Sequence, residues 1–332
     1  MRAPFVWRTG LWAFCWENRA EYVCVRSRGN NLAMLRFLYT TDLHGDPRAY
    51  RRLPELCREH GVSLIVNGGD MLPKGRDMLA EQSAFLGDAM PRFLARCAEL
   101  GVRFYGLFGN DDLCALHENW LDLVNERVHV HDLAEHWHEL PGGEGWWIGG
   151  NSFVPDYPFG LKDWCLRDAV DARPMPTRSR PVISSREGFR PIDDPVAFFA
   201  SRPTLQEHLD ALIDPAVPME RAIFVSHPPP AGLGLGTLWS GEDVGSKSVR
   251  AWVERHRPLL TLSGHIHESP EAEERRCGLL RHTAMCGPTT CHQPGQMLPR
   301  RLTYSIIELD GDAPERVRIA WMHDDLSGVR SE

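Results

Sequence analysis

Short polar motifs recur along this chain, and each directly follows a run of residues that favours a β-strand. Five such motifs occur, in the order Asp42-Leu43-His44, Gly68-Gly69-Asp70, Gly109-Asn110-Asp111, Ser226-His227-Pro228 and Gly264-His265-Ile266-His267. Loops at the ends of strands are where α/β sheets collect ligand-binding groups. The glycines let the backbone turn sharply and approach a ligand closely. The motifs therefore predict an α/β fold whose chemistry lies in strand-end loops.

Strands and helices alternate from Met34 onward. The predicted strands are Leu35–Thr40, Ser63–Val66, Val102–Phe108, Trp146–Gly149, Arg221–Ser226 and Leu259–Ser263. The predicted helices are Arg48–His60, Arg76–Leu100, Leu113–Asn125, Thr204–Ile213 and Ser248–His256. The last third predicts successive antiparallel strands at Leu279–Ala284, Arg301–Leu309 and Arg316–Met322. This order indicates α/β units followed by a β-rich half, packed as sheets with helices outside.

Two segments depart from this pattern. Residues 1–33 place tryptophans among charges without periodicity, and we expect a poorly ordered extension there, with an extra packed element as the alternative. Residues 34–332 are expected to form a single domain. Within it, about 155–202 is rich in Pro, Arg and Asp with little periodicity, which is typical of a long insertion that is either a functional loop or disordered.

Composition limits the class of protein. The 332 residues are 42% apolar and 25% charged, which is ordinary for a soluble globular protein, and the net charge of −8 disfavours a broad nucleic-acid-binding face. Nine cysteines without a C-x-x-C pair indicate reduced thiols. No apolar run approaches the ~20 residues of a membrane helix. We expect a cytoplasmic protein that does not bind membranes.

The motifs contain the side chains needed to hold two metal ions. The candidate ligands are Asp42, His44, Asp70, Asn110, His227, His265 and His267. Mixed nitrogen and oxygen ligation suits manganese, iron or zinc better than calcium or magnesium, which prefer oxygen alone. Residues two apart in an extended segment point the same way, so Asp42 and His44 can reach one ion together.

With these five motifs in this order, the chain resembles the calcineurin-like metallophosphoesterase superfamily, whose pattern is D-x-H, G-D-x, G-N-x, an isolated His and G-H-x-H. The resemblance covers about residues 34–309. It implies a four-layer α/β/β/α sandwich of two mixed β-sheets flanked by helices. It also implies that Asp42, His44 and His267 bind one metal, that Asn110, His227 and His265 bind the other, and that Asp70 bridges both.

This resemblance predicts a dinuclear-metal-dependent phosphoesterase acting on phosphodiesters or small phosphomonoesters. Two divalent ions ~3.5–4 Å apart need a shared anion, which a bridging carboxylate and a bridging hydroxide supply. The hydroxide would attack phosphorus in line, with Asp70, Asn110, Asp111 and His227 as the catalytic residues. The alternatives are a nuclease, for which the arginine-rich stretch Arg173–Arg190 speaks, and a non-catalytic metal-binding scaffold, which the complete ligand set disfavours.

Asp111 departs from the family pattern, because many members have a histidine directly after the Gly-Asn pair. An ionised carboxylate is a poor proton donor for the leaving group. Asp111 therefore orients water or a neighbour, or another group is the acid, or the substrate has a leaving group that needs little help. The alternative without a catalytic role is that Asp111 caps a helix starting near Leu113.

Two further segments have candidate roles. Ser246, Lys247 and Ser248 open a predicted helix and form a possible site for the substrate phosphate, with ordinary N-capping as the alternative. Lys162, Asp163 and Trp164 are either a lid wall or a structural group around a buried tryptophan. The segment Gln293–Gln296 is predicted to be a structural turn.

Overall fold

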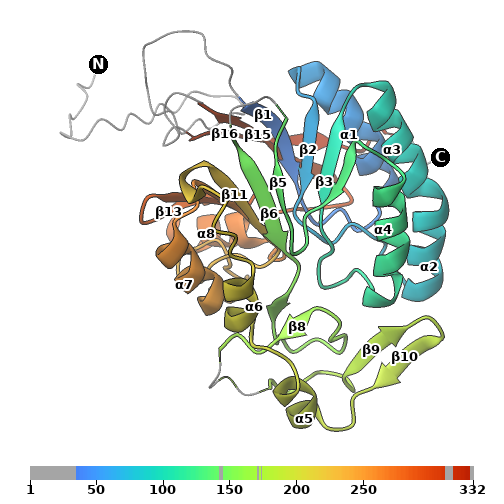
Figure 1. The fold of residues 1–332 in the computed structure, drawn as a ribbon, viewed down its shortest axis with the longest axis vertical. Coiled ribbons are helices and arrows are strands. Elements are labelled where there is room, and N and C mark those ends of the chain that lie inside the picture. Colours follow the sequence, from blue (N-terminus) through green and yellow to red (C-terminus); the bar gives the residue numbers. More distant parts are fainter. Residues whose placement is uncertain (1–34, 142–144, 170–171, 173, 311–316, 330–332) are drawn as a thin grey trace.

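A computed structural model describes residues 35–329 except 142–144, 170–171, 173 and 311–316. The predicted extension at residues 1–33 lies outside the described residues. The described chain forms two large β-sheets that lie face to face, with α1–α4 on one outer side and α6–α8 on the other (Figure 1). No described helix is long and apolar enough to cross a membrane.

The first sheet has six strands in the order β16-β15-β1-β2-β3-β4. Their bounds are β1 Leu35–Thr40, β2 Leu64–Asn67, β3 Arg103–Gly106, β4 Val130–Asp132, β15 Arg301–Leu309 and β16 Val317–Asp325. β1 to β4 are parallel, whereas β15 is antiparallel to both β1 and β16. The sheet is therefore mixed.

The second sheet also has six strands, in the order β13-β14-β12-β11-β6-β5. Their bounds are β5 Trp137–Glu139, β6 Trp147–Asn151, β11 Ala222–Ser226, β12 Leu260–Leu262, β13 Thr283–Cys286 and β14 Thr289–His292. β13 pairs with β14 here and not with β15, so the predicted run of three successive antiparallel strands was wrong on this point. Its partner β14, absent from the sequence prediction, separates the two.

Alternating side chains divide each strand between two cores. Phe37 and Tyr39 of β1 pack between the sheets with Ile223 and Val225 of β11. Leu38 points the other way, into a core shared with helices whose bounds are α1 Pro47–His60, α3 Met90–Glu99 and α4 His117–Asn125. Each such buried side chain contributes about 1.5–3 kcal/mol relative to exposure. The period of two explains the layered packing.

The outer face of the second sheet is covered in the same way. Phe224 lies in a core with residues of α6 Leu205–Ala211 and α7 Lys247–His256, and its ring stacks on Trp252 at 4.2 Å. α8 Ser269–Cys277 follows the last of the five motifs in the chain. The predicted four-layer α/β/β/α sandwich is confirmed.

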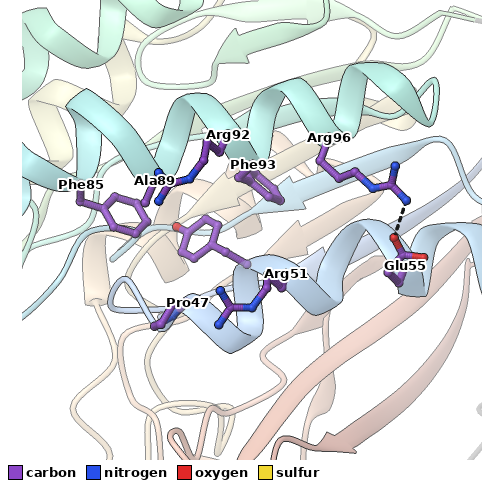
Figure 2. Close-up of a pocket in the computed structure, with 9 residues that line it drawn as sticks. Pro47, Arg51, Glu55, Phe85, Ala89, Arg92, Phe93 and Arg96 are labelled. Carbon is purple, nitrogen blue, oxygen red and sulfur yellow. Dashed lines mark hydrogen bonds and ion pairs between the residues drawn. The ribbon is translucent and has the colours of Figure 1, made fainter. Parts of the chain in front are cut away.

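The helix predicted at Arg76–Leu100 is one helical run with a π-helical turn inside it. α2 Met78–Ala84 is followed by the π-helix Phe85–Ala89 and then α3. A surface pocket of about 800 Å³ lies between this run and α1 (Figure 2). Aromatic side chains including Phe85 and Phe93 line it, and Arg96 pairs with Glu55 across it at 2.8 Å.

The segment 155–202 contains regular structure that the sequence did not predict. Its elements are β7 Val154–Pro155, β8 Cys165–Leu166, β9 Val182–Ser185, β10 Gly188–Pro191 and α5 Pro195–Ala200. β7 pairs with β8, and β9 pairs with β10. They lie beyond the end of the sheets toward which β6 points (Figure 1). Elements of two to six residues are too short to give a periodic signal.

Candidate metal centre

The five motifs meet at one edge of the two sheets because the strands that precede them are parallel within each sheet. β1, β2 and β3 are parallel neighbours in the first sheet, and β11 and β12 are parallel neighbours in the second. Backbone contacts join the loops that follow. Asp42 N donates to Gly69 O at 2.9 Å, and Gly264 N donates to His227 O at 2.9 Å.

Several candidate ligands adopt a strained backbone conformation. Asp42, His44, Asp70 and His265 have φ of 56°, 43°, 52° and 69°, the left-handed region that non-glycine residues rarely enter. Each such residue costs about 1–3 kcal/mol and clusters of them mark functional sites. A Cβ on Gly264 would lie 2.4 Å from Asp42 Oδ2, so only glycine permits this approach.

One group of donors surrounds the end of β1. Ligand atoms of Asp42, His44, Asp70 and His267 all lie within 4.8 Å of one another. His267 Nε2 is 3.2 Å from Asp42 Oδ1 and 3.2 Å from His44 Nε2. Two ring nitrogens that face each other so closely share at most one proton, and a cation between them would satisfy both. This group could hold a metal ion.

A second group adjoins the first through Asp70. The Oδ2 atom of Asp70 is 3.8 Å from His44 Nε2 and 3.5 Å from His227 Nε2. His227 Nε2 lies 3.0 Å from Asn110 Oδ1. The other ring nitrogen, Nδ1, donates to Gly68 O at 2.8 Å, which leaves Nε2 free to bind a ligand.

The remaining predicted ligand, His265, lies beside His227 with ring centroids 5.2 Å apart. Its Nε2 atom is buried and has no hydrogen-bond partner within the described part of the chain. Burial lowers the pKa of His265 to about 3, so its imidazole is neutral. A neutral, buried, unpartnered imidazole nitrogen fits a metal ligand, because a metal ion would supply the missing partner.

The electrostatics of the centre fit cations. Burial raises the pKa of Asp70, but His227 and His44 outweigh this effect and hold the pKa well below its usual range. Burial lowers the pKa of His227, but the carboxylates of Asp70 and Asp42 raise it to about 9. The centre therefore takes up a proton when no metal is bound. All seven predicted ligands lie in this cluster, and they offer both nitrogen and oxygen atoms to a metal ion.

Asp112 supports the centre and was not predicted from the sequence. Its buried carboxylate accepts the N–H groups of Met71, Leu72 and Gly109 at 3.0, 2.7 and 2.8 Å. Burial and the charge of Asp70 raise the pKa of Asp112, and these amide donors act against the rise. The residue joins the loop after β2, which carries Asp70, to the loop after β3.

The segment Gln293–Gln296 supports the loops that carry the first and last motifs. Gln296 Nε2 donates to Thr41 O at 3.1 Å, and Gln293 Nε2 donates to Ile266 O at 2.5 Å. Gly295 between them has φ of 68°. The segment predicted to be a structural turn therefore braces the loops of the first and last motifs.

Asp111 does not cap a helix. The 3₁₀ helix Cys114–Leu116 begins after Leu113 without a side-chain cap, so the capping interpretation was wrong. The Asp111 carboxylate instead pairs with Lys74 Nζ at 2.5 Å, and its backbone N–H donates to Asp70 Oδ1 at 2.9 Å. Burial and Asp70 raise the pKa of Asp111, and Lys74 opposes this rise.

The predicted phosphate contact at Ser246, Lys247 and Ser248 was wrong. Asp168 occupies the start of α7: its carboxylate accepts Ser246 Oγ–H at 2.6 Å and the Lys247 N–H at 2.8 Å. Ser246 also caps the helix by accepting the Val249 N–H at 3.0 Å. The Asp168 carboxylate thus occupies the place at the start of α7 where a phosphate would bind. Of the two interpretations from the sequence, N-capping is the one that the contacts support.

The second candidate group, Lys162 to Trp164, is structural. Lys162 and Asp156 form a buried ion pair, with side chains 1% and 4% exposed. Trp164 is buried against Phe108, and its Nε1–H donates to Asp112 O at 2.6 Å. These residues fix segment 155–202 onto the loop that carries Asn110.

The chain is similar to one protein family and to several solved structures. A family model described as calcineurin-like phosphoesterase matches residues 35–269. One crystal structure has a TM-score of 0.55 at 13% identity, covering 89% of this chain and 100% of its own. TT1561 of Thermus thermophilus has a TM-score of 0.49 at 17% identity, with coverages of 89% and 100%. A dimetal phosphatase from Danio rerio has a TM-score of 0.44 at 11% identity, covering 82% of this chain and 92% of its own. No curated protein sequence matches this chain.

Proposed function

Because the chain belongs to the calcineurin-like phosphoesterase family, we propose that it is a metal-dependent phosphoric ester hydrolase with two ions at the centre. Its substrates are phosphodiesters or small phosphomonoesters. Asp42, His44 and His267 would hold one ion, Asn110, His227 and His265 would hold the other, and Asp70 would be a ligand shared by both. The free thiols of the described cysteines agree with a reducing compartment such as the cytoplasm.

The observation that carries this proposal is the position of Asp70. Its buried carboxylate contacts His44 on one side and His227 on the other, at 3.8 and 3.5 Å. A carboxylate between two imidazole groups is suited to bridging two cations. When bound, manganese, iron or zinc ions would supply a water of lowered pKa and neutralise charge on the phosphoryl oxygens.

The residues around the ligands keep them oriented. The Gly68 carbonyl fixes the His227 ring through Nδ1, and the His265 N–H donates to the Asp42 carboxylate at 3.0 Å. Such outer contacts set ligand direction and raise metal affinity.

Asp111 orients Lys74, one of the alternatives left open by the sequence. Burial lowers the pKa of Lys74, but the carboxylate of Asp111 raises it, so the ammonium keeps its charge. This positive group stands beside the centre, where it favours an anionic substrate. The nuclease alternative gains no support, since Arg180 and Arg186 pair with Asp193 and Glu118.

The test is hydrolysis by the purified chain reconstituted with manganese, iron or zinc. The panel contains phosphomonoesters, cyclic nucleotides, phosphodiesters and oligonucleotides, with phosphate release or chromatography as the readout. We expect turnover of a small ester, near-complete loss in Asp70→Ala, and full activity in Asp122→Ala, whose side chain is exposed on α4. Equal rates for wild type and Asp70→Ala on every substrate would refute the proposal.

A further inference from the structure

We infer that Tyr157 and Phe159 form an aromatic shelf beside the metal centre, and that this shelf selects phosphoesters whose organic group carries a flat ring. The inference rests on the proposed phosphoesterase function and adds the class of substrate to it. Both residues belong to segment 155–202.

The shelf lies against a predicted metal ligand. The Tyr157 ring is tilted by 32° over His265 with centroids 4.8 Å apart, and the Phe159 ring meets His265 edge-on at 6.1 Å. The two aromatic rings also contact each other at 5.8 Å. Tyr157 is only 8% exposed, whereas Phe159 is 43% exposed. Tyr157 is therefore the base of the shelf, and Phe159 is the side chain that a substrate can reach.

The base of the shelf is held by buried contacts. Tyr157 Oη donates to Val244 O at 2.6 Å, and its ring packs in a small core with Val154 and Phe199. The buried ammonium of Lys162 donates to Tyr157 O at 2.6 Å. An apolar group on a fixed backbone binds with a smaller entropic cost than one on a mobile loop.

Hydrogen bonds also fix the shelf relative to the catalytic loops. Asp163 accepts the Cys114 N–H at 2.9 Å, and the Ser184 hydroxyl accepts the Ala115 N–H at 3.0 Å. These bonds join segment 155–202 to the stretch directly after Asn110. A substrate phosphate at the centre and a ring on Phe159 would thus be held at a constant separation.

The chemistry of the exposed ring defines what it selects. A phenyl face gains from an offset or edge-to-face contact with another ring, by about 0.5–1.5 kcal/mol beyond area burial. Nucleobases and simple aryl groups both offer such a face, and stacking on an aromatic side chain tolerates any base. A methyl group or a glycerol offers none. The selected substrates are therefore aryl, benzyl or nucleoside phosphoesters.

The experiment is calorimetric titration of the manganese-loaded protein with benzylphosphonate, methylphosphonate and inorganic phosphate. The phosphonates keep their C–P bond, so binding is read without turnover. The variants are Phe159→Ala and the control Phe189→Ala, because Phe189 is 45% exposed on β10 of the same segment. We expect wild type and the control to bind benzylphosphonate roughly three- to tenfold more tightly than methylphosphonate. Phe159→Ala should bind the two equally, with unchanged affinity for phosphate.

The outcomes separate this inference from the function beneath it. If Phe159→Ala keeps the benzyl preference, the shelf is refuted while the phosphoesterase stands. If wild type binds neither phosphonate nor phosphate and cleaves no ester, the proposed function is refuted, and the substrate preference inferred from the shelf is refuted with it. A matching comparison of kcat/KM for a nucleoside monophosphate against ribose phosphate extends the test to nucleobases, where Phe159→Ala should abolish any preference through KM.

Discussion

Replacing Asp112 by asparagine tests whether this carboxylate holds the two catalytic loops together. The carboxylate accepts three buried amide N–H groups, two at Oδ2 and one at Oδ1. In Asp112→Asn an NH₂ group replaces one oxygen and faces at least one of these donors, so both facing donors are left without an acceptor. An unsatisfied buried donor costs about 1–3 kcal/mol, so we expect a loss of about 3 kcal/mol in the free energy of unfolding.

The assay is thermal unfolding of the metal-free chain, followed by circular dichroism in the presence of a chelator. A loss of 3 kcal/mol corresponds to a decrease in Tm of about 6 °C for a domain of this size. Asp122→Asn is the matched control and should stay within about 0.5 kcal/mol of wild type. Manganese affinity should also fall, by roughly tenfold, because the loops carry Asp70 and Asn110. A Tm within about 1 °C of wild type, with unchanged affinity, would refute the bridging role of Asp112.

Three further predictions follow from other contacts. Burial raises the pKa of Asp132 to about 7, so the folded chain keeps a proton that the unfolded chain loses near pH 4. The free energy of unfolding of wild type, measured with urea, should therefore fall as the pH rises from about 4 to 7. In Asp132→Asn, which cannot titrate at this position, that fall should be smaller. Tyr50→Phe removes the hydrogen bond of 2.8 Å that Tyr50 Oη donates to Met71 O. The free energy of unfolding in urea should fall by ~1 kcal/mol, and an unchanged value would contradict this prediction. If Asp111 donates no proton, phenyl phosphate should turn over faster than benzyl phosphate, because phenolate leaves without help. Asp111→His should narrow this difference in kcat. If phenyl and benzyl phosphate react at equal rates in wild type and also in Asp111→His, the proton donor is another residue.

Much of the fold could be predicted from local sequence. The runs of β-favouring residues at Leu35–Thr40 and Arg301–Leu309 matched β1 and β15 at both ends. Alternation along such strands fixes which side chains face each core, as for Phe37 and Leu38. The motif residues came together because parallel strands bring the loops that follow them to one edge of a sheet. The order of strands and motifs along the chain is enough to predict this arrangement.

Contacts between distant residues could not be predicted in this way. Ser246 meets Asp168, 78 residues earlier in the chain, and that partner decides between a phosphate site and a helix cap. Asp111 pairs with Lys74, 37 residues before it, although its neighbours suggested a cap. The aromatic shelf depends on Tyr157 reaching His265 across a segment without periodicity. In each case the interaction depends on folded geometry rather than on spacing.

The central claim is that this chain holds two metal ions around Asp70, and elemental analysis measures this directly. The purified chain, stripped with a chelator and reconstituted with manganese, should contain two ions per chain after removal of free metal. Asp70→Ala should lose both, because its carboxylate is the contact shared by the two groups of ligands, and Asp122→Ala should keep both. One ion or none in wild type, or two ions retained in Asp70→Ala, would contradict the account.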